Sequence, residues 1–310
     1  MQRVYASLPL SGPSAVAGRD VLLGVQLALD LRPSVELVVL DSFGPDRDEE
    51  ALANARRAAD DSEALVYIGD FHSSQVLATA PALADAELLQ IAPVATFVGL
   101  GGPTLVRLSP SDAAGARAIA AWLESRRVRK ALVVHDHDDG YGKPVGAMCA
   151  RAMSSRGLAV RLEPVWDELP GRPDLGAAEA IVYAGVGGAS IASFFETLHA
   201  LGEDLWLVGT EGVAVPQLAR ELSTAAAERT RLFVAQRAPF AFYGFEAMAL
   251  ALDSVAAGAG ERAGVVRAAL ATRDRQSLLG PYSLDETGLT TTSRYGRMAI
   301  VGRQLVWDLD

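Results

Sequence analysis

The stretch that decides the fold is "ALVYIGDFHSSQVLATAPALADAELL", residues 64–89. A continuous apolar run of strand length stops at Gly69 and Asp70, two serines follow, and an amphipathic pattern of helix length begins. A buried strand that turns directly into a helix is the unit from which parallel sheets are built. A serine hydroxyl and the free N–H groups of a first helical turn can together hold a small anionic group such as a carboxylate.

The same alternation of apolar strand runs and amphipathic helix patterns continues along most of the 310 residues. Continuous Val, Ile, Leu and Ala strands alternating with helices predict parallel sheets covered on both faces, and hence an α/β protein. The predicted strands are residues 4–10, 35–42, 64–70, 88–94, 105–110, 130–136, 158–165, 180–185, 205–211 and 232–238.

The length and the order of these runs predict two lobes rather than one core. The first sheet ends near residue 110, the second begins at Lys130, and the turn cluster "SPSD" at 109–112 is a candidate crossover. The C-terminal segment has Gly and Pro turns and short alternating strands, which predict an antiparallel appendage. We expect residues 1–111 and 238–296 to form lobe 1, and residues 112–237 and 297–310 to form lobe 2.

Composition excludes several classes of function. The net charge of −10, with no long basic run, argues against a nucleic-acid partner. The single cysteine, Cys149, cannot form an intrachain disulfide and lies in a helical pattern, where a small core residue is expected. The N-terminus enters a strand at once, so no signal peptide is visible. The longest uncharged run, residues 88–106, is interrupted by Gly and Pro, so no membrane-inserted segment is predicted.

Polar side chains gather where the predicted strands end. Ser73 and Ser74 follow one strand of the first sheet and Thr96 follows another, whereas Tyr141 and Glu211 follow strands of the second sheet. Ligands of open parallel sheets bind beyond the carboxyl ends of the strands. Hydroxyl groups suit a carboxylate, and a fixed acid suits an ammonium, so the pattern predicts a site for an α-amino acid.

Each of these residues also has an ordinary structural interpretation. A serine at a helix start is commonly an N-cap, and Thr96 could be a turn hydroxyl. Glu211 could be a solvated turn residue, and Tyr141 could be an aromatic packed at a helix start. The ligand hypothesis therefore depends on all four lying at the same class of position.

The motifs resemble the type I periplasmic binding proteins of ABC importers, especially the branched-chain amino-acid-binding branch. The resemblance covers nearly the whole chain in order, in stretches such as "LPLSGPSAVAGRDVLLGVQLALD", "YIGDFHSSQVLATAPALADAELLQIAPVAT", "LVRLSPSDAAGARAIAAWL", "VVHDHDDGYGKPVGAMCARAM", "LVGTEGVA" and "LGPYSLDETGLTT". It implies two Rossmann-like α/β lobes with parallel sheets, joined by three crossover strands and closing on a ligand.

The resemblance also implies roles for individual residues. Ser73 and Thr96 match positions that hold the ligand carboxylate, and a backbone group of Val94 lies beside them. Tyr141 matches the tyrosine of the "YG" turn, and Glu211 matches the acid that takes the ammonium. Ala17 and Val186 stand where aromatic residues are usual, which predicts a wider or more apolar pocket. His72 stands where some relatives have a half-cystine.

Two other constellations compete with this interpretation. His135 and His137 would share one face of a strand and could bind Zn²⁺ or Ni²⁺, which would suit a metal-dependent enzyme. The loop "AGVGGAS" resembles a dinucleotide loop but has Ser190 where the third glycine belongs. We therefore predict no cofactor, no metal and no catalytic residue.

The expected function is that of a non-catalytic solute-binding protein that captures an amino acid or similar zwitterion and passes it to an ABC permease. A ligand-sensing domain with a signalling partner is the alternative, and a metal-dependent enzyme is a weaker one. The resemblance implies an extracytoplasmic location, with a cytoplasmic one as the alternative.

Overall fold

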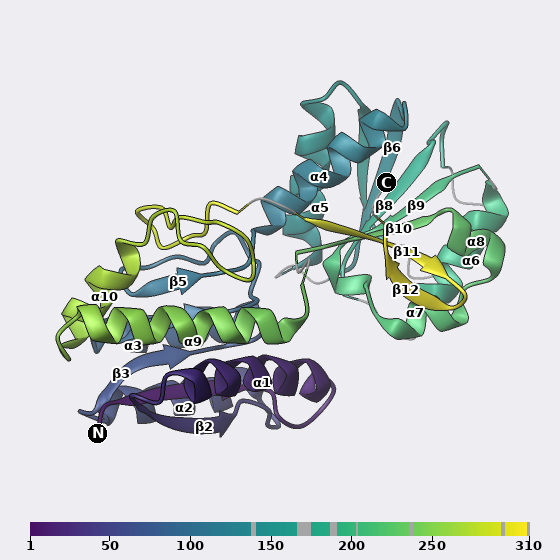
Figure 1. Cartoon of the computed structure of the whole chain (residues 1–310). Coiled ribbons are helices and arrows are strands. Elements are labelled where there is room, and N and C mark those ends of the chain that lie inside the picture. The colour runs from purple at the N-terminus through teal and green to yellow at the C-terminus, as the bar shows by residue number, and fades with distance from the viewer. Residues whose placement is uncertain are drawn as a thin grey trace. The chain divides into compact units, whose positions relative to one another are not determined.

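The computed structural model describes residues 1–137, 141–165, 175–186, 191–202, 204–235, 238–292 and 295–308. The chain divides into two compact units. One comprises Met1–Pro110 and Gln236–Ser293, and the other Ser111–Ala235 and Arg294–Asp310, so the chain passes between them three times. The elements of each unit can be followed in Figure 1.

The first unit is an α/β layer structure around a five-stranded parallel sheet of order β2-β1-β3-β4-β5. Its strands are β1 (Arg3–Leu8), β2 (Glu36–Asp41), β3 (Ala64–Ile68), β4 (Leu89–Ala92) and β5 (Leu105–Arg107). Its helices are α1 (Ala15–Leu31), α2 (Arg47–Asp60), α3 (Ser73–Asp85), α9 (Phe240–Ala257) and α10 (Arg262–Leu270). The predicted strands at these positions are confirmed.

Both faces of this sheet are buried, which explains the continuous apolar strands. On one face Val4, Ala6 and Leu8 pack against α1 and α9, which lie side by side in Figure 1. On the other face Tyr5 and Tyr67 pack among the alanines of α2. Because successive strand residues point to opposite faces, a strand covered on both sides needs apolar residues at every position.

Helix α9 is, among the described residues, the one helix long and apolar enough to cross a membrane by length and composition. Most of it is buried inside the unit, and Ala247, Met248 and Ala251 belong to the core against the sheet. The apolar character of α9 is therefore accounted for by its packing against both the sheet and the neighbouring helix α1.

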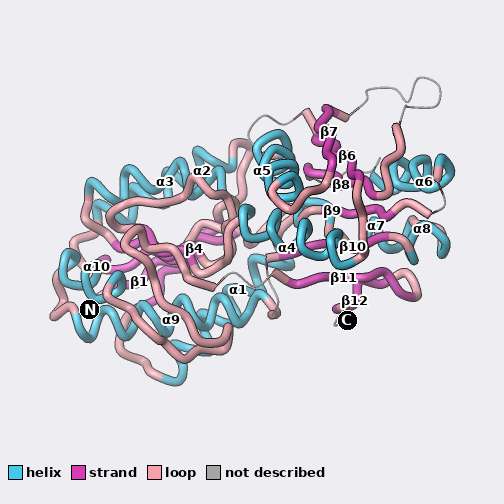
Figure 2. The backbone as a smooth tube through the Cα atoms, turned by 90° about the horizontal axis from the view of Figure 1, so that it is seen from above, coloured by secondary structure: helices cyan, strands magenta, loops and turns pink. Residues whose placement is uncertain are grey.

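The second unit contains a seven-stranded sheet of order β12-β11-β10-β9-β8-β6-β7, which Figure 2 shows from above. Its strands are β6 (Lys130–His135), β7 (Ala159–Pro164), β8 (Ala180–Ala184), β9 (Trp206–Gly209), β10 (Thr230–Val234), β11 (Gly296–Val301) and β12 (Gln304–Trp307). Its helical segments are α4 (Asp112–Ser125), α5 (Gly142–Ser154), α6 (Ile191–Leu201), η1 (Glu211–Val213), α7 (Pro216–Glu221) and α8 (Thr224–Glu228). Strand β11 pairs antiparallel with both β10 and β12, in agreement with the antiparallel appendage predicted for the C-terminal segment, and the other neighbouring strands pair parallel.

An aromatic and arginine stack fastens this C-terminal hairpin to the rest of the second unit. The rings of Trp122 and Trp206 meet edge to face, with centroids 5.1 Å apart. Four guanidinium groups lie over the two rings at 4.8–6.0 Å, those of Arg126, Arg229, Arg231 and Arg297. Asp308, just beyond β12, accepts hydrogen bonds from Nε of Arg231 at 2.8 Å and Nε of Arg297 at 2.7 Å.

We predict that Asp308→Asn destabilises the second unit by about 2–3 kcal/mol, because it leaves two partly buried guanidinium groups without their shared carboxylate. The matched control is Asp204→Asn. The Asp204 side chain is fully exposed and pairs with Arg229 at 3.0 Å, so its removal should have a much smaller effect, because solvent screens exposed ion pairs. Urea unfolding followed by tryptophan fluorescence measures both. Equal effects of the two substitutions would contradict the assignment.

Candidate functional site

Three strands of the first sheet deliver polar residues to one edge. The parallel register aligns Ala6 of β1, Ile68 of β3 and Ile91 of β4, so all three strands end at the same edge of the sheet. The chain continues from these ends to Ser14, which precedes α1, to His72 and Ser73 at the start of α3, and to Thr96. The structure therefore brings together the polar residues that the sequence places after these strands.

Ser73 is the first residue of α3, with His72 as the N-cap, so it is not the capping residue itself. Its Oγ accepts hydrogen bonds from the backbone N–H groups of Thr96 and Phe97, both at 3.3 Å. A hydroxyl offers two acceptor positions and one donor. With both acceptor positions used, the Ser73 hydroxyl is left as a hydrogen-bond donor, which suits an anionic ligand group.

The loop after β4 holds Thr96 rigidly. Thr96 is buried, and Arg107 Nη1 donates to the carbonyl of Phe97 at 2.7 Å and to that of Thr96 at 3.4 Å. No hydrogen-bond partner of the Thr96 hydroxyl is found among the residues that the structure describes. The side chain of Val94 is buried in the core, so a ligand cannot contact that side chain.

Ser74 has a different environment from Ser73. Its hydroxyl donates to Asp48 Oδ1 of α2 at 2.9 Å. This bond joins α2 to α3, and it uses the one proton that Ser74 could have offered to a carboxylate. The sequence gives no sign of this pairing, because Asp48 lies 26 residues away. Its predicted role in ligand binding stays a prediction, with less support than that of Ser73.

A buried carboxyl group lies beneath this edge, and the sequence analysis did not identify it. Asp70 is fully buried and accepts hydrogen bonds from Ser7 Oγ at 2.8 Å and from the Tyr67 hydroxyl at 3.2 Å. Burial raises the pKa of Asp70 to about 7. Asn54 Nδ2 donates to Ser7 at 3.2 Å and extends the network to α2. The only sign of it in the sequence is that Asp70 closes an otherwise apolar strand run, after Gly69.

His72 is held neutral at the same edge. Its Nε2 lies 3.2 Å from Ser14 Oγ, and its ring meets Phe71 edge to face. Burial, and then the charge of Arg47, lowers the pKa of His72 from 6.5 to about 4. A neutral imidazole beside Ser73 adds no positive charge to the edge, so recognition of an anion there depends on hydrogen-bond donors.

The lowered pKa of His72 predicts a pH dependence of stability. Between about pH 4 and 6.5 the folded protein binds fewer protons at His72 than the unfolded chain does. The neutral His72 therefore contributes to the free energy of unfolding above pH 6.5. This stabilisation is lost as the pH falls to 4, and the loss is about 3 kcal/mol at most.

We therefore expect His72→Gln to lose less stability than the parent protein when urea unfolding at pH 7 is compared with pH 4.5. Asp70 is present in both proteins, so its opposite contribution cancels in this comparison. The same pH slope in both proteins would show that His72 titrates normally.

In the second unit, Tyr141 and Glu211 come together from the ends of β6 and β9. Burial, followed by the charges of Asp112 and Glu211, raises the pKa of Tyr141 well above its ordinary value, so it remains a neutral phenol. Glu211 Oε2 accepts a hydrogen bond from the backbone N–H of Ala235 at 3.2 Å. Gly212 passes so close to the Gly185 carbonyl that any side chain there would collide with it, and the Tyr141 ring lies next to the same position.

Asp136 arranges the loops around these residues. Its Oδ2 accepts a hydrogen bond from the backbone N–H of Val186 at 2.8 Å. Side chains at Gly142 and Gly185 would collide with its carboxylate, so both glycines make room for it. The Val186 side chain is 57% exposed. The sequence assigns no role to this acid, because Gly185 and Val186 lie far from it along the chain.

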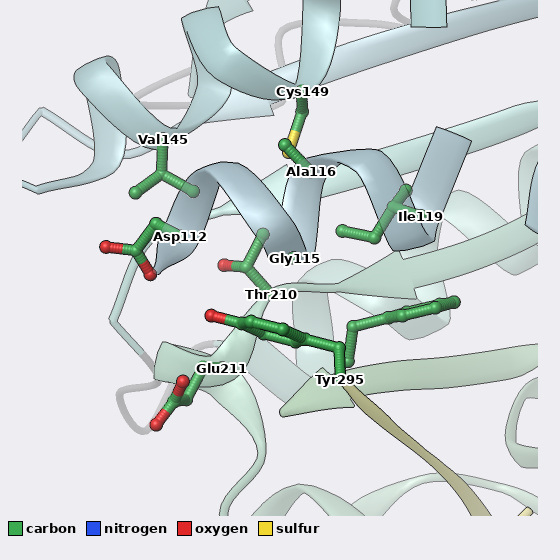
Figure 3. Close-up of a pocket in the computed structure, with 10 residues that line it drawn as sticks. Asp112, Gly115, Ala116, Ile119, Val145, Cys149, Thr210, Glu211 and Tyr295 are labelled. Atoms are coloured by element: carbon green, nitrogen blue, oxygen red, sulfur yellow. The ribbon is translucent and has the colours of Figure 1, made fainter. Parts of the chain in front are cut away.

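A small cavity of about 10 Å³ has Glu211 in its lining, and at this size it holds about one water molecule. Figure 3 shows oxygen atoms of Asp112, Thr210 and Tyr295 gathered on one side of it, with Cys149 on another. Cys149 is fully buried, and burial raises the pKa of its thiol to about 12, so it is the inert core residue that the sequence predicts. Asp112 is an acid of this region that the sequence analysis did not single out.

The alternative constellations gain no support. His135 Nδ1 lies 2.6 Å from the carbonyl oxygen of Asp136. Within the described ranges, no three His, Cys, Asp or Glu side chains lie close enough together to hold a metal ion. Asp138 and Asp139 of "HDHDD", and residues 187–190 of the "AGVGGAS" loop, lie outside the described residues.

Comparison with known proteins identifies the family. The sequence matches the family described as periplasmic binding protein over residues 3–225, so the chain belongs to that family. No curated protein matches it significantly. Solved structures share its type I periplasmic binding protein fold, with two lobes and parallel sheets.

Three of these structures are of proteins that bind leucine or p-hydroxybenzoic acid. A leucine-binding protein, LivK, from Thermotoga maritima MSB8 is 20% identical, with a TM-score of 0.83 over 99% of this chain and 98% of that one. An ABC transporter substrate-binding protein from Desulfitobacterium hafniense in complex with Leu is 15% identical, with a TM-score of 0.83 over 99% of both chains. A solute-binding protein of an ABC transporter from Rhodopseudomonas palustris HaA2, in complex with p-hydroxybenzoic acid, is 16% identical, with a TM-score of 0.80 over 99% of this chain and 95% of that one.

Proposed function

We propose that this protein is a non-catalytic solute-binding protein that captures an α-amino acid or a similar small zwitterion for an ABC permease. The observation that carries the proposal is the polarity of the two strand edges. In the first unit the Ser73 hydroxyl is left as a donor beside Thr96. In the second unit Glu211 lies beside the neutral phenol of Tyr141.

The two edges match the two ends of a zwitterion. Donor hydroxyls and the first-turn N–H groups of α3 suit a carboxylate, and the Glu211 carboxylate suits an ammonium. We take the two compact units as the lobes that close on the ligand, divided near residues 111, 237 and 296, since hinge closure is a common motion of two-lobed binding proteins. Val94 would contribute a backbone group, and the exposed Val186 would border the ligand's side chain.

Glu211 also favours an amino acid over an aromatic acid. A hydroxybenzoate has a carboxylate for Ser73 but no cationic group for Glu211. Enclosing an acid without a counter-charge is costly, so such a ligand would bind poorly here. Membership of the periplasmic binding protein family supports an extracytoplasmic location and a permease partner.

We predict that calorimetry against an amino-acid panel that also contains 4-hydroxybenzoate finds an amino-acid ligand. Ser73→Ala and Glu211→Gln should each weaken its binding about 10- to 100-fold, because each removes one charge-assisted interaction worth about 1.5–3 kcal/mol. Glu221→Gln is the matched control, since Glu221 is exposed and, among the described residues, accepts a hydrogen bond only from Gln217 in its own helix at 2.7 Å. Unchanged affinity in both site variants would refute the proposed roles.

A further inference from the structure

Helix α1 presents a row of large apolar side chains to solvent. Val16 is 83% exposed, Leu23 and Leu27 are each 49% exposed, and Leu31 is 73% exposed. At 100° per residue these four side chains lie within about 80° of one another around the helix, so they form one stripe. Asp20 lies in the same sector, where its Oδ2 accepts a hydrogen bond from the backbone N–H of Ala241 at 3.2 Å. We call this stripe the outer face of α1. Exposed apolar side chains gathered on one side of a helix are typical of contact sites between proteins.

The core of the first unit does not need the outer face. The opposite side of α1 already packs through Val21, Val25 and Ala28, which are buried against the sheet. Gly24 lies against the backbone of Ala241 in α9, so the seam between the two helices is also closed. The outer face of α1 is therefore not needed for the packing of the first unit.

Two opposite charges flank the outer face along one side. Arg19 and Asp30 are both exposed and lie eleven positions apart in α1. This spacing puts them about 20° apart around the helix and about 16 Å apart along it. Arg19 Nε donates to the carbonyl of Ala15 in the same helix at 3.2 Å. Neither residue has an ion-pair partner among the residues that the structure describes.

We propose that the outer face of α1 binds the same face of a second copy. The two helices are antiparallel, and the two-fold axis passes between them at the level of Gly24 and Val25 along each helix. A two-fold axis perpendicular to both helices keeps the charged flanks on the same side. Arg19 then faces Asp30 of the partner subunit, and Asp30 faces the partner's Arg19. A two-fold axis parallel to the helices would instead place the two charged flanks on opposite sides of the interface, where Arg19 and Asp30 would have no charged partner.

The contact is small, which sets the expected strength. One helix face covers less than the roughly 800 Å² per partner of a standard interface, so the association should be reversible and dependent on concentration. It involves only the first unit and no ligand, so it is independent of the proposed function.

The first test is sedimentation of the full chain from micromolar to millimolar concentration. We expect dimers at the upper end, and Leu23→Glu should weaken dimerisation at least tenfold by placing a charge in the stripe. Leu77→Glu is the control, because Leu77 of α3 is 47% exposed and lies off α1. A parent protein that stays monomeric throughout, or equal effects of both substitutions, overturns the proposal.

Charge reversal tests the antiparallel arrangement. Arg19→Asp alone and Asp30→Arg alone should each weaken self-association about tenfold, because each places two pairs of like charges across the interface. Mixing the two single variants should restore dimers as heterodimers, which native mass spectrometry resolves by mass. The double variant should restore the homodimer. If neither the mixture nor the double variant recovers association, the antiparallel pairing is wrong.

Discussion

The parallel hydrogen bonding of β1, β3 and β4 is the constraint on which the first unit depends. Because the three strands run in one direction and in register, the chain leaves all of them at a single edge. That geometry brings Ser73 within hydrogen-bond distance of the backbone of Thr96 and Phe97, although 23 and 24 residues separate them in sequence. The polarity of the Ser73 hydroxyl is thus a product of sheet register rather than of local sequence.

The same edge contains polar groups that are expensive to bury, and each is compensated locally. Asp70 is enclosed by Ser7 and Tyr67 and stays neutral over part of the physiological range, since burial raises its pKa to about 7. Burial also disfavours the charged form of His72, but because that form is a cation, its pKa is lowered where the pKa of Asp70 is raised. With His72 neutral and Asp70 partly neutral, these two residues add little fixed charge to the edge. Its selectivity for an anion therefore depends on oriented donors.

Much of the fold could be predicted from sequence because it follows from periodicity. Continuous apolar runs alternating with helix patterns identified the strands of both sheets, and the turn-rich C-terminus identified the antiparallel hairpin. The strand-end rule also singled out Ser73, Tyr141 and Glu211. What it could not provide were pairings across the fold: Ser74 with Asp48, Asp136 with Val186, and Asp112 near Tyr141. These pairings depend on which loops lie next to each other in the folded protein, and the spacing of residues in one sequence does not indicate which loops those are.

The separation of the candidate groups into two units has a consequence for affinity if the proposed function holds. The Ser73 hydroxyl or Glu211 alone offers a ligand about 1.5–3 kcal/mol, which is less than the cost of immobilising a small molecule. Neither unit would then retain an amino acid by itself, and binding would require both sets of contacts at once. A ligand that satisfied only one end would be released quickly, whatever its fit there. Discrimination between a zwitterion and a simple acid would in that case come from the requirement for simultaneous contacts, more than from the shape of either edge.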